Sequence, residues 1–200
     1  ASSGTTDLYW RSEELSSTSP MASKAFSFIF RRQLDGTDNA DILTAGTNYE
    51  RLVGGLGDDT LVGSDRSDQL LGGDGNDLMT GGKGNDAYVF LDNWGEDTVT
   101  ELANGGAEDS LDFTAISDEL TIAFQPSVTV PGETAPTTPG ISVEDDLALN
   151  TVTAAFVENV LVGSGANTYK LYDFWAYQEA AGLLGSEGKI TVGDDSLVDV

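Results

Sequence analysis

The sequence contains neither cysteine nor histidine among its 200 residues. Without cysteine, the chain cannot form disulfides or use a thiolate as nucleophile or ligand. Without histidine, it cannot build a histidine-based triad, an HExxH zinc site or a histidine general base. The side chains that remain for chemistry are mainly carboxylates, Lys, Tyr and Ser/Thr.

Basic residues are also scarce, because 9 Lys and Arg stand against 34 Asp and Glu, giving a formal net charge of −25. Such a chain repels itself unless cations neutralise it. It would also repel nucleic acid, whose binding requires Lys and Arg near the phosphates, so we expect no nucleic-acid partner. With 39% hydrophobic residues, the chain is nevertheless not a simple disordered acidic tail.

Long hydrophobic runs are absent as well, and none approaches the ~20 apolar residues of a membrane span. The stretch MASKAFSFIFRR, residues 21–32, is a poor signal peptide. Its apolar part is short, is interrupted by Ser27, and ends in arginines rather than in a small-residue cleavage site. We therefore expect an export address, if there is one, to lie elsewhere or outside this chain.

What the chain does have is a nine-residue repeat over residues 36–89. It reads GTDNADILT, AGTNYERLV, GGLGDDTLV, GSDRSDQLL, GGDGNDLMT and GGKGNDAYV. Position six is always acidic and position eight is always apolar. Neither a packed core nor a helix requires this spacing, so it indicates a backbone wrapped around something positive.

The first six residues of each repeat predict a tight turn, where glycines supply unusual backbone angles and expose carbonyl oxygens. The acid at position six adds a carboxylate. Carbonyls and carboxylates are the hard oxygen ligands that Ca²⁺ prefers, whereas Mg²⁺ demands a stricter octahedron. The absence of His and Cys argues against zinc or copper. The repeat therefore predicts several bound Ca²⁺ ions.

The last three residues of each repeat predict a short strand with position eight facing inward. Two nonapeptides then make one turn of a flattened parallel coil, so repeats n and n+2 stack at the same edge. We call these edges edge one and edge two. Edge one stacks Asp41, Asp59 and Asp77 and continues to Asp97, and edge two stacks Glu50, Asp68 and Asp86.

The candidate calcium ligands are the turn glycines, the acids at positions three and six, and Asn39 in place of a glycine. They are Gly36, Asp38, Asn39, Asp41, Gly54, Gly55, Gly57, Asp59, Gly63, Asp65, Asp68, Gly72, Gly73, Asp74, Gly75, Asp77, Gly81, Gly82, Gly84, Asp86 and Asp97. We expect good sites between repeats one and three, three and five, and four and six. Edge two departs from the pattern, because Arg66 brings a positive charge beside the ion path, and the site between repeats two and four is in doubt. For Glu101, Asp109 and Asp112, a calcium role and an exposed strand edge both stay open.

The block resembles the RTX glycine-rich nonapeptide, GGxGxDxUx, of secreted bacterial calcium-binding proteins. The resemblance is close over residues 36–99 and looser over 100–124 and 151–171. It implies an all-β fold, a right-handed parallel β-roll with flanking β-strand caps. It also implies calcium-dependent folding and export by type I secretion, and hence a secreted protein on or outside the bacterial cell surface.

Outside the repeat, the sequence predicts three further regions around a roll at 34–124. Residues 1–33 form a Ser/Thr-rich tail or cap strand, residues 125–141 a Pro-rich loop, and residues 142–200 a second, degenerate module. The second module is indicated by GKGNDAYVF at 82–90, which resembles GSGANTYKL at 163–171. A short helix is expected at 176–185. The final segment 193–200 fits either a strand of that module or an export address.

Two functions remain open. One is a secreted or surface-attached structural module for assembly or adhesion, with other copies of itself or a larger surface assembly as partners. The other is the C-terminal accessory region of a secreted protease, lipase or polysaccharide epimerase. We expect no enzyme activity in the chain itself, because the obvious carboxylate pairs all lie in the calcium register.

Overall fold

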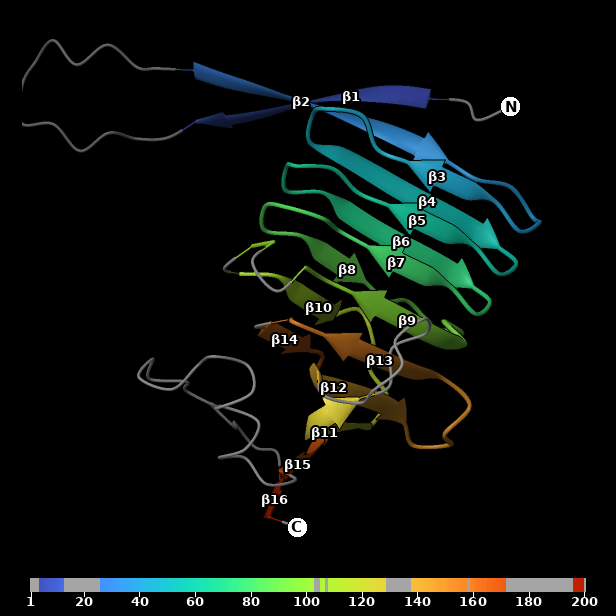
Figure 1. Cartoon of the computed structure of the whole chain (residues 1–200), viewed down its shortest axis with the longest axis vertical. Coiled ribbons are helices and arrows are strands. Elements are labelled where there is room, and N and C mark those ends of the chain that lie inside the picture. The colour runs from blue at the N-terminus through green and yellow to red at the C-terminus, as the bar shows by residue number, and fades with distance from the viewer. Residues whose placement is uncertain are drawn as a thin grey trace, which may run out of the picture.

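The computed structural model describes residues 4–12, 26–102, 105–106, 108–128, 138–157, 159–171 and 196–199. Within these ranges, every regular element is a β-strand, so the predicted all-β class is confirmed there. The strands form two sheets that run along the long axis of the molecule (Figure 1).

Sheet A contains seven strands and sheet B nine. In sheet order, sheet A consists of β1 Gly4–Ser12, β2 Phe26–Asp35, β4 Glu50–Leu56, β6 Gln69–Asp74, β8 Ala87–Val89, β10 Ser110–Phe113 and β14 Asn159–Val162. Sheet B consists of β16 Ser196–Asp199, β15 Thr168–Leu171, β11 Leu120–Val128, β12 Thr138–Asp145, β13 Thr151–Ala155, β9 Glu96–Thr100, β7 Leu78–Thr80, β5 Thr60–Val62 and β3 Ile42–Thr44.

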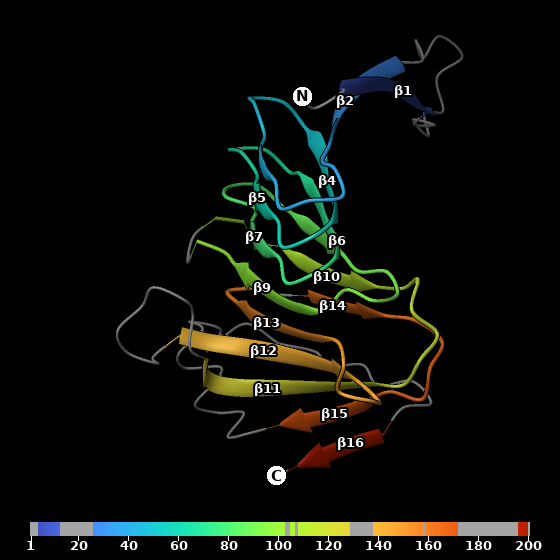
Figure 2. The ribbon, with the colours of Figure 1, turned by 90° about the vertical axis from the view of Figure 1, so that its right-hand side faces the viewer.

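From β2 to β10, successive strands alternate between the two sheets. Figure 2 shows β5, β7 and β9 on one side and β4, β6 and β10 on the other. Pairing is parallel and joins equivalent positions two repeats apart, such as Leu52 with Leu70 and Leu61 with Met79. The predicted stacking of repeats n and n+2 is therefore confirmed.

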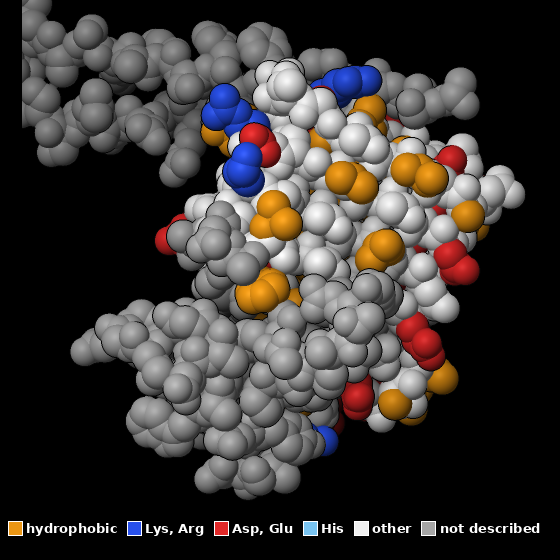
Figure 3. All heavy atoms as spheres, in the orientation of Figure 1, with side chains coloured by type: hydrophobic (Ala, Val, Ile, Leu, Met, Phe, Trp, Pro, Cys, Tyr) orange, Lys and Arg blue, Asp and Glu red, His pale blue; other side chains and the backbone are white. Residues whose placement is uncertain are grey.

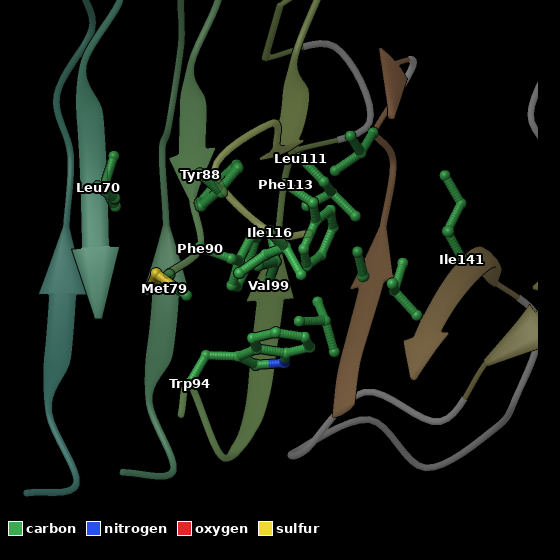
Figure 4. Packing of buried hydrophobic residues seen from close by; sticks show 14 of the residues in the cluster. Leu70, Met79, Tyr88, Phe90, Trp94, Val99, Leu111, Phe113, Ile116 and Ile141 are labelled. Atoms are coloured by element: carbon green, nitrogen blue, oxygen red, sulfur yellow. The ribbon is translucent and has the colours of Figure 1, made fainter. Parts of the chain in front are cut away.

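The core between the sheets is built from position eight of the repeats. Its members, at most 6% exposed, are Leu43, Leu52, Leu61, Leu70, Met79 and Tyr88. Farther along the chain, larger aromatics take over: Phe90 stacks on Phe113 with ring centroids 4.4 Å apart, and Trp94 meets both rings edge-on. Figure 4 shows this aromatic group beside Tyr88 and Met79, so the core is continuous beyond the repeats.

At its start, sheet A is extended by an antiparallel hairpin of β1 and β2, which places strands in the segment expected to be a tail or cap strand. Farther on, sheet B contains an antiparallel excursion, since β12 pairs with both β11 and β13. β11 ends at Val128 and β12 begins at Thr138, so strands reach into both ends of the segment expected to be a Pro-rich loop.

The chain returns to parallel pairing after this excursion. β15 pairs with β11, and β16 pairs with β15, so the strand interpretation of the final segment is confirmed over Ser196–Asp199. The two strands that the internal repeat relates, β8 and β15, lie in different sheets. The helix expected at 176–185 lies outside the described residues.

Candidate metal centre

The acids at position six stack in two ladders, one along each edge. On edge one, the backbone N–H groups of Asp41, Asp59 and Asp77 each donate to the Oδ1 atom of the next acid, at 2.7, 2.7 and 2.8 Å. The last acceptor is Asp97, as predicted. Edge two repeats the pattern through Glu50, Asp68, Asp86 and Asp109, at 2.7, 2.6 and 2.8 Å.

The second carboxylate oxygen separates the acids into two groups. On Asp59, Asp77, Asp86 and Asp97, the Oδ2 atom is buried and has no hydrogen-bond partner among the described residues. A buried charged oxygen without a partner is costly, and a bound cation removes that cost. The donor set, carboxylates beside backbone carbonyls, fits Ca²⁺. These four acids are therefore the best-placed calcium ligands of the two ladders.

Burial changes the proton affinity of these acids. Burial raises the pKa of Asp77 to about 6 and that of Asp97 to about 8, and on Asp97 the neighbouring Asp77 adds to the effect. Loss of hydration disfavours the charged form of a carboxyl group, and a like charge nearby does the same. The charged form of both carboxylates is therefore disfavoured in the metal-free fold, and at neutral pH Asp97 retains its proton.

The remaining acids are satisfied by their own loops. The Oδ2 atom of Asp68 accepts hydrogen bonds from the backbone N–H and the hydroxyl of Ser64, at 2.7 and 2.8 Å. Thr37 donates in the same two ways to Asp41, both at 2.7 Å. A backbone N–H, that of Gly46, donates to Glu50. In these loops, a hydrogen bond from the loop itself satisfies the second carboxylate oxygen, which has no partner among the described residues in the other loops.

The backbone conformation of the loops also differs between the acids whose Oδ2 atom lacks a partner among the described residues and the acids that their own loops satisfy. The loops of Asp59, Asp77 and Asp86 have glycine at positions two and four, with positive φ throughout, for example 114° at Gly73 and 141° at Gly75. Side chains rarely adopt these angles. A Cβ atom on Gly73 would also overlap the carbonyl of Gly55 in the neighbouring loop. Thr37 and Ser64 at position two have no positive φ.

The acids at position three, Asp38, Asp65 and Asp74, are exposed, and Asp65 pairs with Lys83 at 2.9 Å. Figure 3 shows exposed acids along the right-hand margin, where β4 and β6 run into edge one. Arg66 is exposed too, and no ion pair of the described residues joins it to edge two. On edge two, the hydroxyl of Ser64 contacts a ladder acid, Asp68, whereas the guanidinium of Arg66 forms no ion pair with one in the described part of the chain.

The contacts of Ser64 and Thr37 with the position-six acids were not predicted from the sequence. The available signal was a hydroxyl residue four positions before the acid, because Ser and Thr readily hydrogen-bond to nearby polar groups in turns. For Asp112, left open above, the structure shows a different contact, since its Oδ1 atom accepts from the N–H and hydroxyl of Thr114. Glu101 and Asp109 are buried, so the exposed-edge interpretation is wrong for both.

In the looser repeat at 163–171, Asn167 stands where Asp86 stands in the first copy. It is 1% exposed. Its Oδ1 atom accepts from the backbone N–H of Leu120 at 3.1 Å, as a position-six acid does. Its amide nitrogen donates to the carbonyl of Gly165 at 3.0 Å. Asn167 thus keeps the hydrogen bond from the backbone N–H of the neighbouring turn but lacks the negative charge of an aspartate.

Comparisons with known proteins agree with this geometry. A family model described as the RTX calcium-binding nonapeptide repeat matches residues 53–88 in 4 copies. No curated protein matches the chain. In the part of the chain that the structure describes, no helix is long and apolar enough to cross a membrane. Residues 53–88 therefore carry RTX calcium-binding nonapeptide repeats, and the chain binds Ca²⁺ through them.

Proposed function

We propose that this protein is a secreted or cell-surface structural module that folds as a right-handed β-roll when it meets extracellular Ca²⁺. One observation carries the proposal. Along edge one, Asp59, Asp77 and Asp97 follow one another in successive turns, each with a buried Oδ2 atom that lacks a partner among the described residues. Such a stack is stable when cations lie between its members.

The charge of the chain supports calcium-dependent folding. With 34 acids and a formal net charge of −25, the metal-free chain repels itself. Extracellular calcium modules bind in the range of about 10⁻⁴–10⁻³ M, far above the cytosolic concentration. The chain would thus stay expanded inside the cell and fold after export, since binding free energy becomes folding free energy.

The end of sheet B supports a role in assembly. β3 is the last strand of this sheet, and among the described residues its outer edge pairs with no other strand. Ile42 on β3 is 79% exposed. An open strand edge with an apolar side chain is a template for pairing with another chain. A second copy of this protein is the partner that we propose for this edge.

Light scattering in millimolar Ca²⁺ and in EDTA tests the assembly role. We expect the apparent mass to rise with calcium and to return towards that of the monomer in Ile42→Lys. A monomer in both conditions would refute assembly through β3 and would leave calcium binding untouched. It would then favour the other role, an accessory region of a secreted enzyme.

A further inference from the structure

Edge two ends in a group of three buried acids, of which Asp86 belongs to the last matched repeat and Glu101 and Asp109 lie beyond it. They are 1%, 2% and 1% exposed. One carboxylate oxygen from each lies within 4.8 Å of the other two. Oxygen ligands lie about 2.3–2.6 Å from Ca²⁺, so two ligands on opposite sides of one ion are about 5 Å apart. The three oxygens are thus spaced to bind a single ion.

A second observation indicates a ligand at this point. The Oδ2 atom of Asp86 is buried and has no partner among the described residues. It faces Glu101 across Gly81, because a Cβ atom on Gly81 would overlap both Asp86 Oδ2 and Glu101 Oε1. Glycine at this position therefore keeps side-chain atoms out of the space between the two carboxylates.

Glu101 does not belong to the nonapeptide register. It follows β9 in sheet B, whereas Asp86 and Asp109 precede β8 and β10 in sheet A. Its carboxylate is held in place by Tyr88, whose hydroxyl donates to Oε1, and by the backbone N–H of Leu102, which donates to Oε2 at 3.2 Å. The Tyr88 hydroxyl in turn accepts from the backbone N–H of Gly81 at 2.6 Å.

We propose that Asp86, Glu101 and Asp109 bind one Ca²⁺ ion at the end of edge two, in a site that the nonapeptide pattern does not specify. The proposal rests on the proposed calcium function and extends it to residues outside the matched segment. Three carboxylates converge here, whereas within the repeats each site draws on two stacked acids. The ion would join sheet A to sheet B where the repeat array ends.

The number of charged ligands and the rigidity of a site set its calcium affinity. With three carboxylates, one of them fixed by a buried tyrosine, this site is expected to bind more tightly than the sites on edge one. It would therefore fill first in a titration. The end of the array would then be organised before the repeats that precede it.

Calorimetric titration of the full chain with CaCl₂ tests the proposal in three variants. Glu101→Gln keeps the shape of the side chain and an acceptor for Tyr88 but removes the charge. Glu96→Gln makes the same change at an exposed position on β9 and is the matched control. Asp77→Asn removes a ligand from edge one.

We expect Glu101→Gln to lose the tightest ion or to bind it at least tenfold more weakly, while Glu96→Gln titrates like the wild type. Asp77→Asn should lose weaker sites and keep the tight one. Unchanged binding in Glu101→Gln would overturn the proposal. A wild-type chain that takes up no calcium would instead refute the proposed function itself.

Terbium luminescence gives an independent result if Glu101→Gln does not fold. Tb³⁺ substitutes for Ca²⁺ at oxygen sites and emits when a nearby tyrosine is excited. We expect the emission at one equivalent of Tb³⁺ to fall several-fold in Tyr88→Phe, which keeps all three carboxylates. It should persist in Tyr49→Phe, whose ring is 42% exposed. Equal emission from Tyr88→Phe and the wild type would place the first ion elsewhere.

Discussion

At the residue scale, two separate tasks belong to each of four position-six acids, Asp59, Asp68, Asp77 and Asp86. Its Oδ1 atom accepts the backbone N–H of the neighbouring turn, and its Oδ2 atom either faces a partner from its own loop or has none. Asp68 illustrates the first case and Asp77 the second. Asn167 shows that the first task survives without a charge. Within the repeats, the loops that leave the Oδ2 atom without a partner have glycine with positive φ at both positions two and four, whereas Gly46, a position-two glycine without a positive φ, donates its backbone N–H to Glu50.

Ser64→Gly is expected to create a calcium ligand. The substitution removes the hydroxyl that donates to Asp68 Oδ2, and it permits a positive φ that would turn the backbone N–H of residue 64 away from the same oxygen. Calorimetry should show about one additional ion per chain. Ser64→Ala is the control, since it removes the hydroxyl but keeps a Cβ atom, and it should gain none. If Ser64→Gly gains no ion either, the residue at position two does not determine occupancy.

Asp77→Asn is expected to raise the calcium concentration needed for folding, because this acid stacks between Asp59 and Asp97 and serves the sites on both sides of it. The asparagine keeps the Oδ1 acceptor, so the ladder contact can persist. Asp118→Asn makes the same change at an exposed acid outside both ladders. A calcium titration followed by circular dichroism should shift the midpoint several-fold for Asp77→Asn and little for Asp118→Asn. Equal midpoints would contradict a shared role for Asp77.

At the element scale, three-residue strands such as β5 and β7 gain their stability from the turns stacked on either side. A strand this short buries one side chain, such as Leu61 or Met79, both of which are 0% exposed. Each turn is therefore stable only within the stack. The ladder hydrogen bonds and the ions between loops hold successive turns in register.

Leu61→Ala is expected to cost about 2–5 kcal/mol in the free energy of unfolding, because it opens a cavity between two sheets that cannot close over it. The control is Leu78→Ala on the next strand of the sheet, where the side chain is 40% exposed. Chemical denaturation in saturating calcium measures both. Comparable losses in the two variants would mean that position eight does not form the core.

Most of the repeat could be predicted from its sequence because each turn depends on local rules. The period of nine predicted the strands, the inward direction of position eight and the two edges. It also led to Asp97, which lies two residues beyond the position that the period gives. The hydrogen bonds from Ser64 and Thr37 to the acids of their own loops were not predicted, because they depend on the direction in which a backbone N–H points. The group around Glu101 could not be derived either, since it joins segments of both sheets. The β11–β12–β13 excursion likewise depends on pairing distant in sequence.

At the scale of the whole molecule, the fold confines many negative charges to two edges. The excess of 25 negative charges acts on the unfolded and folded chain alike, but folding also buries every ladder acid except Asp41. Protons and calcium ions are the two ways to neutralise them. The stability of the protein should therefore fall as the pH rises and increase as calcium is added.

In the absence of calcium, the fold is expected to be more stable at pH 5 than at pH 9. In the folded chain burial raises the pKa of Asp77 to about 6 and that of Asp97 to about 8, above the usual value near 4. Groups of this kind contribute stability at low pH, and the contribution is lost as the pH rises through the folded-state pKa. Thermal unfolding in EDTA, followed from pH 5 upwards, should show a midpoint that falls with pH until no folded chain remains at pH 9. A midpoint that rises over this interval would contradict the burial of these acids.

The most direct test of calcium-driven folding is far-ultraviolet circular dichroism of the full chain at pH 9, first in EDTA and then in millimolar Ca²⁺. We predict a coil spectrum in EDTA that becomes a β spectrum on addition of Ca²⁺, with a midpoint of about 10⁻⁴–10⁻³ M. The same concentration of Mg²⁺ should produce little change, because Mg²⁺ requires a smaller and stricter octahedron. A β spectrum in EDTA that calcium leaves unchanged would contradict the account.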